Sequence, residues 1–114
     1  EFRGGLGLDI EFEMLEETYV TTVVERTKLP PWGINGGKEA RPNDVILIKN
    51  NGEKINIPKK TGFKLNKGEK IIFVTGGGGG YGDPKKRKKF SIEDDLKQEY
   101  LSKDYIKEHY NFYQ

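Results

Sequence analysis

Residues 70–84 read KIIFVTGGGGGYGDP, and the expected architecture follows from this stretch. Its first six residues form an apolar run with the length of a buried strand. Five consecutive glycines follow, which can adopt backbone angles that side chains forbid and let a backbone or ligand approach closely. Asp83 precedes Pro84, and a residue before proline is disfavoured in helical geometry, so the loop ends there. A strand followed by a glycine-rich loop commonly presents backbone N–H groups to an anion.

Two nucleotide-binding motifs resemble this loop without matching it. Gly77, Gly79 and Gly82 have the spacing of the dinucleotide fingerprint, but any run of glycines meets that spacing by chance. The true fingerprint opens a helix whose N-terminus faces the pyrophosphate, whereas Asp83 and Pro84 interrupt the chain here. No Gly-Lys-Ser/Thr follows, so the P-loop pattern also fails. The sequence therefore argues against nucleotide binding by this loop alone.

Two stretches near the start of the chain are predicted to pair. Residues 8–14 alternate between apolar and acidic side chains, which predicts a half-buried strand with one wet face. Residues 18–25 are rich in Thr, Val and Tyr, and we expect them to form its antiparallel partner. The acidic row of Asp9, Glu11 and Glu13 could bind a hard cation, but an exposed polar face is more common and we assign it no function.

A second hairpin is predicted in the middle of the chain. Residues 45–49 and 53–57 flank Asn50-Asn51-Gly52, and an Asn-Gly turn between apolar runs is the strongest short-range hairpin signal. Together with the strands around residue 63 and at residues 70–75, this gives at least five short strands. The predicted class is mainly β (α+β), an antiparallel sandwich or barrel.

The character of the chain changes after Pro84. Ser91 is predicted to cap one helix, with acidic residues in its first turn, and Ser102 to cap a second. We therefore expect residues 1–84 to form an antiparallel β domain with glycine-rich loops. Residues 85–114 would form a basic hinge and a two-helix C-terminal tail packed on it, one structural domain overall.

The connection between residues 26 and 44 has no periodicity and contains the single tryptophan, Trp32. Connections of this length inside a compact domain are usually functional or disordered. Trp32 lies between Pro31 and Gly33, which argues against simple disorder. Two interpretations remain open: Trp32 caps the edge of the core, or it lines a site or an interface.

Composition limits the kinds of site. The chain has 114 residues, no cysteine, one histidine and a net charge of +2. Disulfides, thiolate nucleophiles and His/Cys zinc sites are therefore excluded, and we predict no metal site. No apolar run approaches the ~20 residues of a membrane span. A cytoplasmic setting fits, and because the chain starts without methionine we expect it to be a piece of a longer polypeptide.

The run from Lys85 to Lys89 suggests an alternative function, a small β-barrel module that contacts nucleic acid or an acidic protein. An acidic stretch follows at once, and no aromatic ladder interleaves the charges. We therefore expect no nucleic-acid binding. Arg87 is expected to pair with a carboxylate, for example Asp83.

With these residues in view, the chain resembles the hydantoinase B/oxoprolinase family. The resemblance rests on Gly-Gly-Gly-Gly-Tyr-Gly-Asp-Pro at 77–84 and on three earlier stretches. These are Phe2-Arg3-Gly4-Gly5-Leu6-Gly7, then Arg26 with Pro31-Trp32-Gly33 and Gly36-Gly37, and Leu65 with Gly68-Glu69. The chain departs from the family at Glu99, where relatives usually have glycine between the helices. It also departs at Asn111-Phe112, where they have Gly-Val.

The resemblance implies the C-terminal part of a B-type subunit, in a group that includes N-methylhydantoinase, 5-oxoprolinase and acetone carboxylase. Such an enzyme is an ATP-dependent cyclic amide hydrolase or a related carboxylase. Its expected partners are the upstream part of the same subunit, an A-type ATP-binding subunit and a small cyclic amide substrate. ATP, Mg²⁺ and, as an open alternative, another divalent metal would serve the full assembly, none of them in this piece. Its catalytic and metal residues would lie upstream, so the isolated piece is expected to be inactive.

Within that assembly, we expect the two glycine-containing loops to supply a wall, a lid or an interface. A strand exit needs one or two glycines, and five suggest a functional as well as a structural role, in a surface loop with few core contacts. The candidate residues are Arg26, Trp32, Gly33, Gly36, Gly37, Gly76, Gly77, Gly78, Gly79, Gly80, Tyr81 and Asp83.

Overall fold

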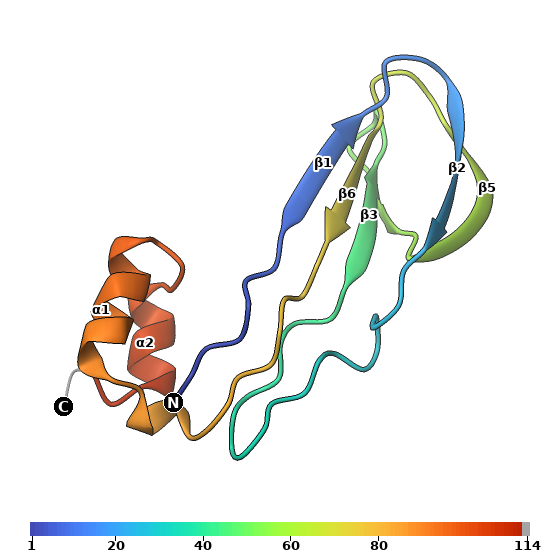
Figure 1. Ribbon diagram of the computed structural model, residues 1–114. Coiled ribbons are helices and arrows are strands. Elements are labelled where there is room, and N and C mark those ends of the chain that lie inside the picture. The colour runs from blue at the N-terminus through green and yellow to red at the C-terminus, as the bar shows by residue number, and fades with distance from the viewer. Residues whose placement is uncertain (113–114) are drawn as a thin grey trace. The chain divides into compact units, whose positions relative to one another are not determined.

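The computed structural model describes residues 1–112, in which six strands and two α-helices confirm the predicted mainly β (α+β) class (Figure 1). The elements are β1 (Asp9–Glu13), β2 (Thr18–Val23), β3 (Asp44–Ile48), β4 (Lys54–Asn56), β5 (Lys59–Leu65), β6 (Lys70–Val74), a 3-10 turn η1 (Pro84–Lys86), α1 (Lys89–Lys97) and α2 (Lys103–His109).

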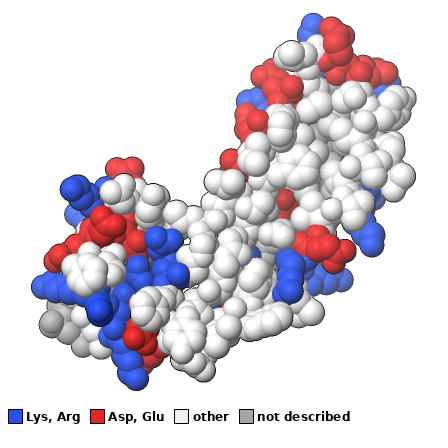
Figure 2. Space-filling view, viewed as in Figure 1, with Lys and Arg blue, Asp and Glu red and all other residues white. Residues whose placement is uncertain are grey.

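The described chain divides into two compact units. The strand unit comprises residues 7–30 and 41–76 and holds all six strands. The helix unit comprises residues 1–6, residues 31–40 and the chain from residue 77 onward. Charged side chains of both signs gather over its helices (Figure 2). The sequence-based boundary at residue 84 stays a prediction. Within the described residues, α1 and α2 are too short and too polar to span a bilayer.

Two antiparallel sheets build the strand unit. One has the order β1-β6-β3-β4 and the other pairs β2 with β5, and neither closes into a barrel within the described residues. Their shared core is made by apolar side chains from both sheets and from the link after β4: Val45, Leu47, Ile57, Leu65 and Ile71. Partly buried residues such as Val20 and Phe63 pack around it. The predicted alternatives were a sandwich and a barrel, and the structure has two packed sheets rather than a closed barrel in the part of the chain that it describes.

The predicted hairpin of β1 with β2 is wrong. β1 pairs with β6, with Glu11 opposite Ile72, and β2 pairs with β5, with Val20 opposite Phe63. Each strand has a partner distant in sequence, and these long-range pairings outweigh the short connection between β1 and β2. The prediction that β1 is half-buried is also wrong, because all five of its residues are exposed.

The Asn-Gly hairpin is confirmed. β3 and β4 pair with Leu47 opposite Ile55. The turn is closed by a hydrogen bond from the Glu53 N–H to the Asn51 side-chain oxygen (2.9 Å), and Gly52 has the positive φ of 84° that the turn requires.

The two predicted helices are present, but only one of the two caps is right. Ser102 caps α2, accepting from the Tyr105 N–H (3.1 Å). Ser91 does not cap α1, because that helix already starts at Lys89 and its N-cap, Lys88, makes no side-chain hydrogen bond.

α1 ends in a Schellman motif that is usually built on glycine. Glu99 has φ 60°, its N–H donates to the Leu96 carbonyl oxygen (3.1 Å), and the Tyr100 N–H donates to the Asp95 carbonyl oxygen (2.9 Å). The joint between the helices thus keeps the left-handed residue that glycine would supply, with a glutamate in its place.

Candidate functional site

Three glycine-containing segments of the helix unit lie side by side and are joined by backbone hydrogen bonds. We call this arrangement the glycine layer; it comprises residues 2–5, 32–38 and 78–82. The last segment is central: Phe2 and Tyr81 exchange both backbone hydrogen bonds (2.8 and 2.9 Å). On the other side, the Ile34 N–H donates to the Gly80 carbonyl oxygen and the Gly82 N–H donates to the Ile34 carbonyl oxygen, each at 2.9 Å.

These segments approach so closely that side chains cannot fit between them. A Cβ atom added to Gly79 would lie 1.9 Å from the Trp32 carbonyl oxygen, and one added to Gly4 would lie 2.0 Å from that of Gly78. A Cβ atom added to Gly37 would lie 2.1 Å from the Gly80 carbonyl oxygen. Real Cβ contacts are never this short, so the layer requires glycine at these positions. The loop was expected to make few core contacts, and its close contacts are with the backbone of the other two segments.

Three N–H groups of the glycine run, those of Gly76, Gly78 and Gly80, donate to acceptors within the protein. Those of Gly78 and Gly80 donate to the carbonyl oxygens of Gly5 (3.0 Å) and Lys38 (2.9 Å). That of Gly76 donates to the Asn43 side-chain oxygen (2.8 Å) in the strand unit. A phosphate cradle needs several free N–H groups converging on one anion, and these groups are not free to form it.

Apolar side chains project from the layer as one row. Phe2, Tyr81 and Ile34 sit at paired positions on the three segments and are each about half exposed. The Phe2 and Tyr81 ring centroids are 6.2 Å apart, and the Asn35 side-chain amide donates to the Tyr81 hydroxyl (2.8 Å). Trp32, at the end of its segment, is 66% exposed. The layer therefore presents a rigid, largely apolar surface, which suits contact with a flat ligand or another protein surface.

The predicted site residues fall in both units. Trp32, Gly33, Gly36, Gly37, Tyr81, Asp83 and Gly77 to Gly80 belong to the helix unit, whereas Arg26 and Gly76 belong to the strand unit. Asp83 has a local role, since its carboxylate accepts from the Lys85 N–H (2.9 Å) and starts the 3-10 turn.

Arg26 adopts φ 59°, a left-handed conformation that is uncommon for a residue with a side chain. Asn43 holds it there: its N–H donates to the Arg26 carbonyl oxygen and its side-chain amide donates to that of Glu25, each at 3.0 Å. The same side chain accepts from Gly76. Sequence reasoning missed Asn43, which has no local motif because its partners lie on two distant segments.

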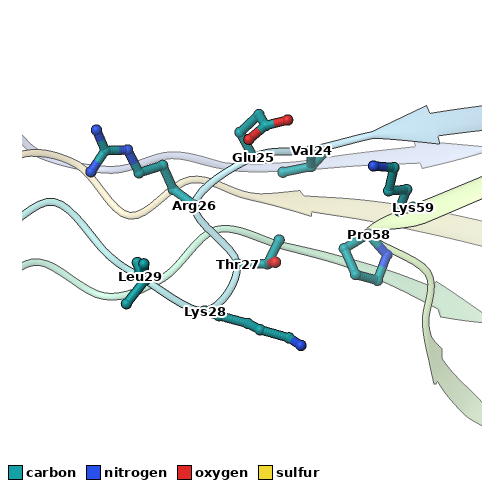
Figure 3. A pocket seen from close by; sticks show the side chains of 8 residues that line it. All are labelled: Val24, Glu25, Arg26, Thr27, Lys28, Leu29, Pro58 and Lys59. Carbon is teal, nitrogen blue, oxygen red and sulfur yellow. The ribbon is translucent and has the colours of Figure 1, made fainter.

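A groove of about 520 Å³ runs beside Arg26 in the strand unit (Figure 3). Its walls come from the loop after β2 and from the start of β5. The residues that line it are Val24, Glu25, Arg26, Thr27, Lys28, Leu29, Pro58 and Lys59. Apolar and oppositely charged groups are mixed along it, so the groove does not identify one class of ligand.

The proposed pairing of Arg87 with Asp83 is wrong. Arg87 donates to the Asp95 carboxylate on α1 (2.6 Å), which also accepts from Arg3 (3.1 Å). Both Asp95 and Arg87 are buried, with side chains 4% and 9% exposed. The basic run is therefore not a continuous exposed patch, because its central residue anchors α1 to the first segment of the layer. The sequence signals for this anchor were the expected carboxylate partner of Arg87 and the Arg3-Gly4-Gly5 motif.

His109 ends α2, with its ring centroid 4.2 Å from that of Tyr105 and its Nδ1 2.9 Å from the Lys38 ammonium. In residues 1–112, no group of three or more His, Cys, Asp or Glu side chains is placed to hold a metal ion.

Comparison with known proteins gives a consistent set of relatives. A family model described as hydantoinase B/oxoprolinase matches residues 1–84. The chain is 39% identical over 82 residues to a 5-oxoprolinase of Dictyostelium discoideum, covering 72% of this chain and 6% of that protein. It is 35% identical over 111 residues to a caprolactamase subunit beta of Pseudomonas jessenii, covering 91% and 19%.

An uncharacterized protein of Methanocaldococcus jannaschii is 35% identical over 102 residues, covering 90% of this chain and 18% of that protein. No solved structure matches. The chain thus spans less than a fifth of the length of each of these three relatives.

Proposed function

The chain belongs to the hydantoinase B/oxoprolinase family, and we propose that it is the C-terminal part of a B-type subunit of an ATP-dependent cyclic amide hydrolase. The family match over residues 1–84 is the observation that carries this proposal. The names of two relatives, 5-oxoprolinase and caprolactamase subunit beta, support it. 5-Oxoproline and caprolactam are both lactams, in which the amide is part of a ring.

Within the proposed subunit, the glycine layer forms a wall or an interface beside the site of reaction. Its close backbone packing makes it rigid, and rigid positioning is what a surface that orients a substrate or a partner needs. Phe2, Ile34 and Tyr81 supply the apolar contact, and Asn35 fixes the Tyr81 hydroxyl. The amide group of the substrate is planar, which fits a surface of this kind.

Nucleotide and metal chemistry belong to other parts of the assembly in this proposal. The N–H groups of Gly76, Gly78 and Gly80 are bonded within the protein, and the described residues place no cluster of metal ligands. We therefore assign ATP and Mg²⁺ to an A-type partner subunit and to the rest of the B-type subunit, in a cytoplasmic enzyme. The residues of this chain bind and orient, and they hold no reacting proton.

The test uses the full-length subunit together with its A-type partner. Substrate-dependent ATP hydrolysis is measured with hydantoin, 5-oxoproline, caprolactam and acetone. Turnover with at least one of the three cyclic amides is expected. Turnover with acetone alone, or no turnover with any of the four, contradicts the proposal.

The role of the layer is tested in the same assay. Trp32→Ala and Gly78→Val are expected to lower turnover at least about 10-fold, the effect of misplacing a surface that positions substrate. The control, Leu15→Ala, removes a side chain that is 77% exposed in the strand unit and should leave turnover unchanged. Thermal unfolding of each variant is recorded alongside. Equal turnover in all three variants refutes the role of the layer.

A further inference from the structure

Strand β1 has one face whose charged side chains form ion pairs and one face whose apolar side chains are exposed. On the charged face, Glu11 forms an ion pair with Lys70 (2.8 Å) and Asp9 forms one with Arg41. Exposed ion pairs of this kind are compatible with water and contribute little to stability. This face is therefore suited to remain in contact with solvent.

The opposite face of β1 continues the core of the strand unit. Ile10 lies opposite Phe73 and Phe12 lies opposite Ile71 on β6. On the next strand, Val45 and Leu47 of β3 lie opposite the same Phe73 and Ile71. Because directly opposed residues of antiparallel strands share a face, these six side chains, Ile10, Phe12, Ile71, Phe73, Val45 and Leu47, point to one side of the sheet.

This side is covered over β3 and β6 and open over β1. Val45 and Leu47 have no exposed surface and Ile71 is 3% exposed, whereas Ile10 and Phe12 are 42% and 50% exposed. The second sheet pairs β2 with β5, and its side chains pack on β3 and β6. Leu8, at the same parity, is exposed as well. We call Leu8, Ile10 and Phe12 the β1 apolar face.

β1 also lies at an edge of the four-stranded sheet of the described residues. Soluble proteins usually protect such edges with lysine, proline or a bulge, and β1 instead pairs in regular register over its whole length. Figure 2 shows a broad uncharged area over the strands, with acidic side chains along the margin where β1 lies. An open edge beside an open apolar face indicates that another chain segment covers both.

We propose that the β1 apolar face is the surface against which the rest of the same B-type subunit packs. This rests on the proposed function, in which the chain is part of a longer subunit. The relatives that cover most of this chain match it over only 18% and 19% of their own length. A polypeptide about five times longer is therefore the partner present at the highest effective concentration.

A second copy of the chain fits this surface less well. Antiparallel pairing of two β1 strands through their free edges, centred on Glu11, places acidic side chains directly opposite one another: Glu11 opposite Glu11 and Asp9 opposite Glu13. Like charges at directly opposed positions destabilise a sheet. The occupant is therefore a segment with apolar side chains at alternate positions and without a matching acidic row.

Thiol labelling tests the proposal with two neighbouring variants, because the chain itself contains no cysteine. Ile10→Cys places a thiol on the β1 apolar face, and Glu11→Cys places one on the opposite face as the matched control. Each variant is made in the 114-residue chain and in the full-length subunit, and its rate of reaction with a maleimide is measured under native conditions. The parent subunit supplies the background from any other thiols.

In the full-length subunit, the thiol of the Ile10→Cys variant should react at least about 100-fold more slowly than in the 114-residue chain, because labelling then requires local opening. The thiol of the Glu11→Cys variant should react at similar rates in both. Equal rates for the two variants in the full-length subunit overturn the proposal.

Two further results also overturn it, in favour of another occupant. Protection of the Ile10→Cys thiol in the 114-residue chain that rises with its concentration indicates a second copy. Protection in the full-length subunit only after the A-type partner is added indicates that partner. Labelling does not depend on turnover. Absence of activity on all four substrates would therefore contradict the proposed function without changing the labelling result.

Discussion

Replacing Glu99 by glycine should make the helix unit more stable. Glu99 occupies the left-handed position of the Schellman motif that ends α1, with φ 60°. Both hydrogen bonds of that motif are formed, from the Glu99 N–H to the Leu96 carbonyl oxygen (3.1 Å) and from the Tyr100 N–H to the Asp95 carbonyl oxygen (2.9 Å). The geometry is therefore already the one that glycine adopts, and the substitution removes only the strain of the side chain.

The size of the effect is a difference of two terms. The left-handed conformation costs a residue with a Cβ atom about 1–2 kcal/mol. Glycine loses more backbone freedom than other residues when it folds, which reduces the stabilisation from relieving this strain by about 0.5–1 kcal/mol. The net increase in the free energy of unfolding is thus about 0.5–1 kcal/mol, or about 3–6 °C in Tm for a unit of this size.

Urea unfolding followed by tryptophan fluorescence is a direct assay, because the single tryptophan, Trp32, lies in the same unit as Glu99. Glu99→Ala should change nothing, since alanine keeps the Cβ atom, and Glu99→Asn should fall between alanine and glycine. The matched control is Gln98→Gly, one residue earlier at φ −80°, which should destabilise by about 0.5–1 kcal/mol. A Glu99→Gly variant no more stable than Glu99→Ala would refute the reasoning.

Three further predictions concern the same unit. Gly79→Ala should lower the free energy of unfolding by about 3 kcal/mol, because the new Cβ would overlap a backbone oxygen 1.9 Å away; Gly5→Ala, with no atom within 4 Å, should change it by less than about 0.5 kcal/mol. Asp95→Asn leaves the nearly buried Arg87 guanidinium and the partly exposed Arg3 guanidinium without their counterion and should cost about 3–5 kcal/mol in urea unfolding, while exposed Asp94→Asn should cost little. Burial raises the pKa of the Tyr110 phenol, so above about pH 10 the unfolded chain loses this proton first and stability falls as the pH rises; a pH series of unfolding curves should show a shallower fall for Tyr110→Phe, and an unchanged fall would contradict this.

Local signals predicted the elements of this fold better than their partners. The turn at Asn51-Gly52 defines its own hairpin, and Ser102 defines the start of α2, because each needs only residues a few positions away. The pairing of β1 with β6 depends on segments about sixty residues apart, for which the sequence carries no local signal. Alternation along β1 correctly separated its two faces but did not reveal that one face has no cover within the described residues.

The candidate site was predicted by residue type rather than by geometry. The glycine run was identified, but the reason for it lies in two other segments whose carbonyl oxygens contact it. Arg87 was expected to have a carboxylate partner, and the nearest one in sequence was the wrong choice, because the actual partner, Asp95, lies in the second turn of α1 and is buried. The sequence carried no signal for which residues distant along the chain would come into contact.

The glycine layer has a consequence for how the chain is made. Arg3 and Asp95, which anchor its first segment to α1, are 92 residues apart. A ribosome adds about 5–20 residues per second, so the first segment waits about 5–20 s after its own synthesis before its partners emerge. During that interval its backbone groups are hydrated and its apolar side chains are accessible to chaperones. The order of events follows: the strands of both sheets can pair before the layer exists, and the helix unit is completed last.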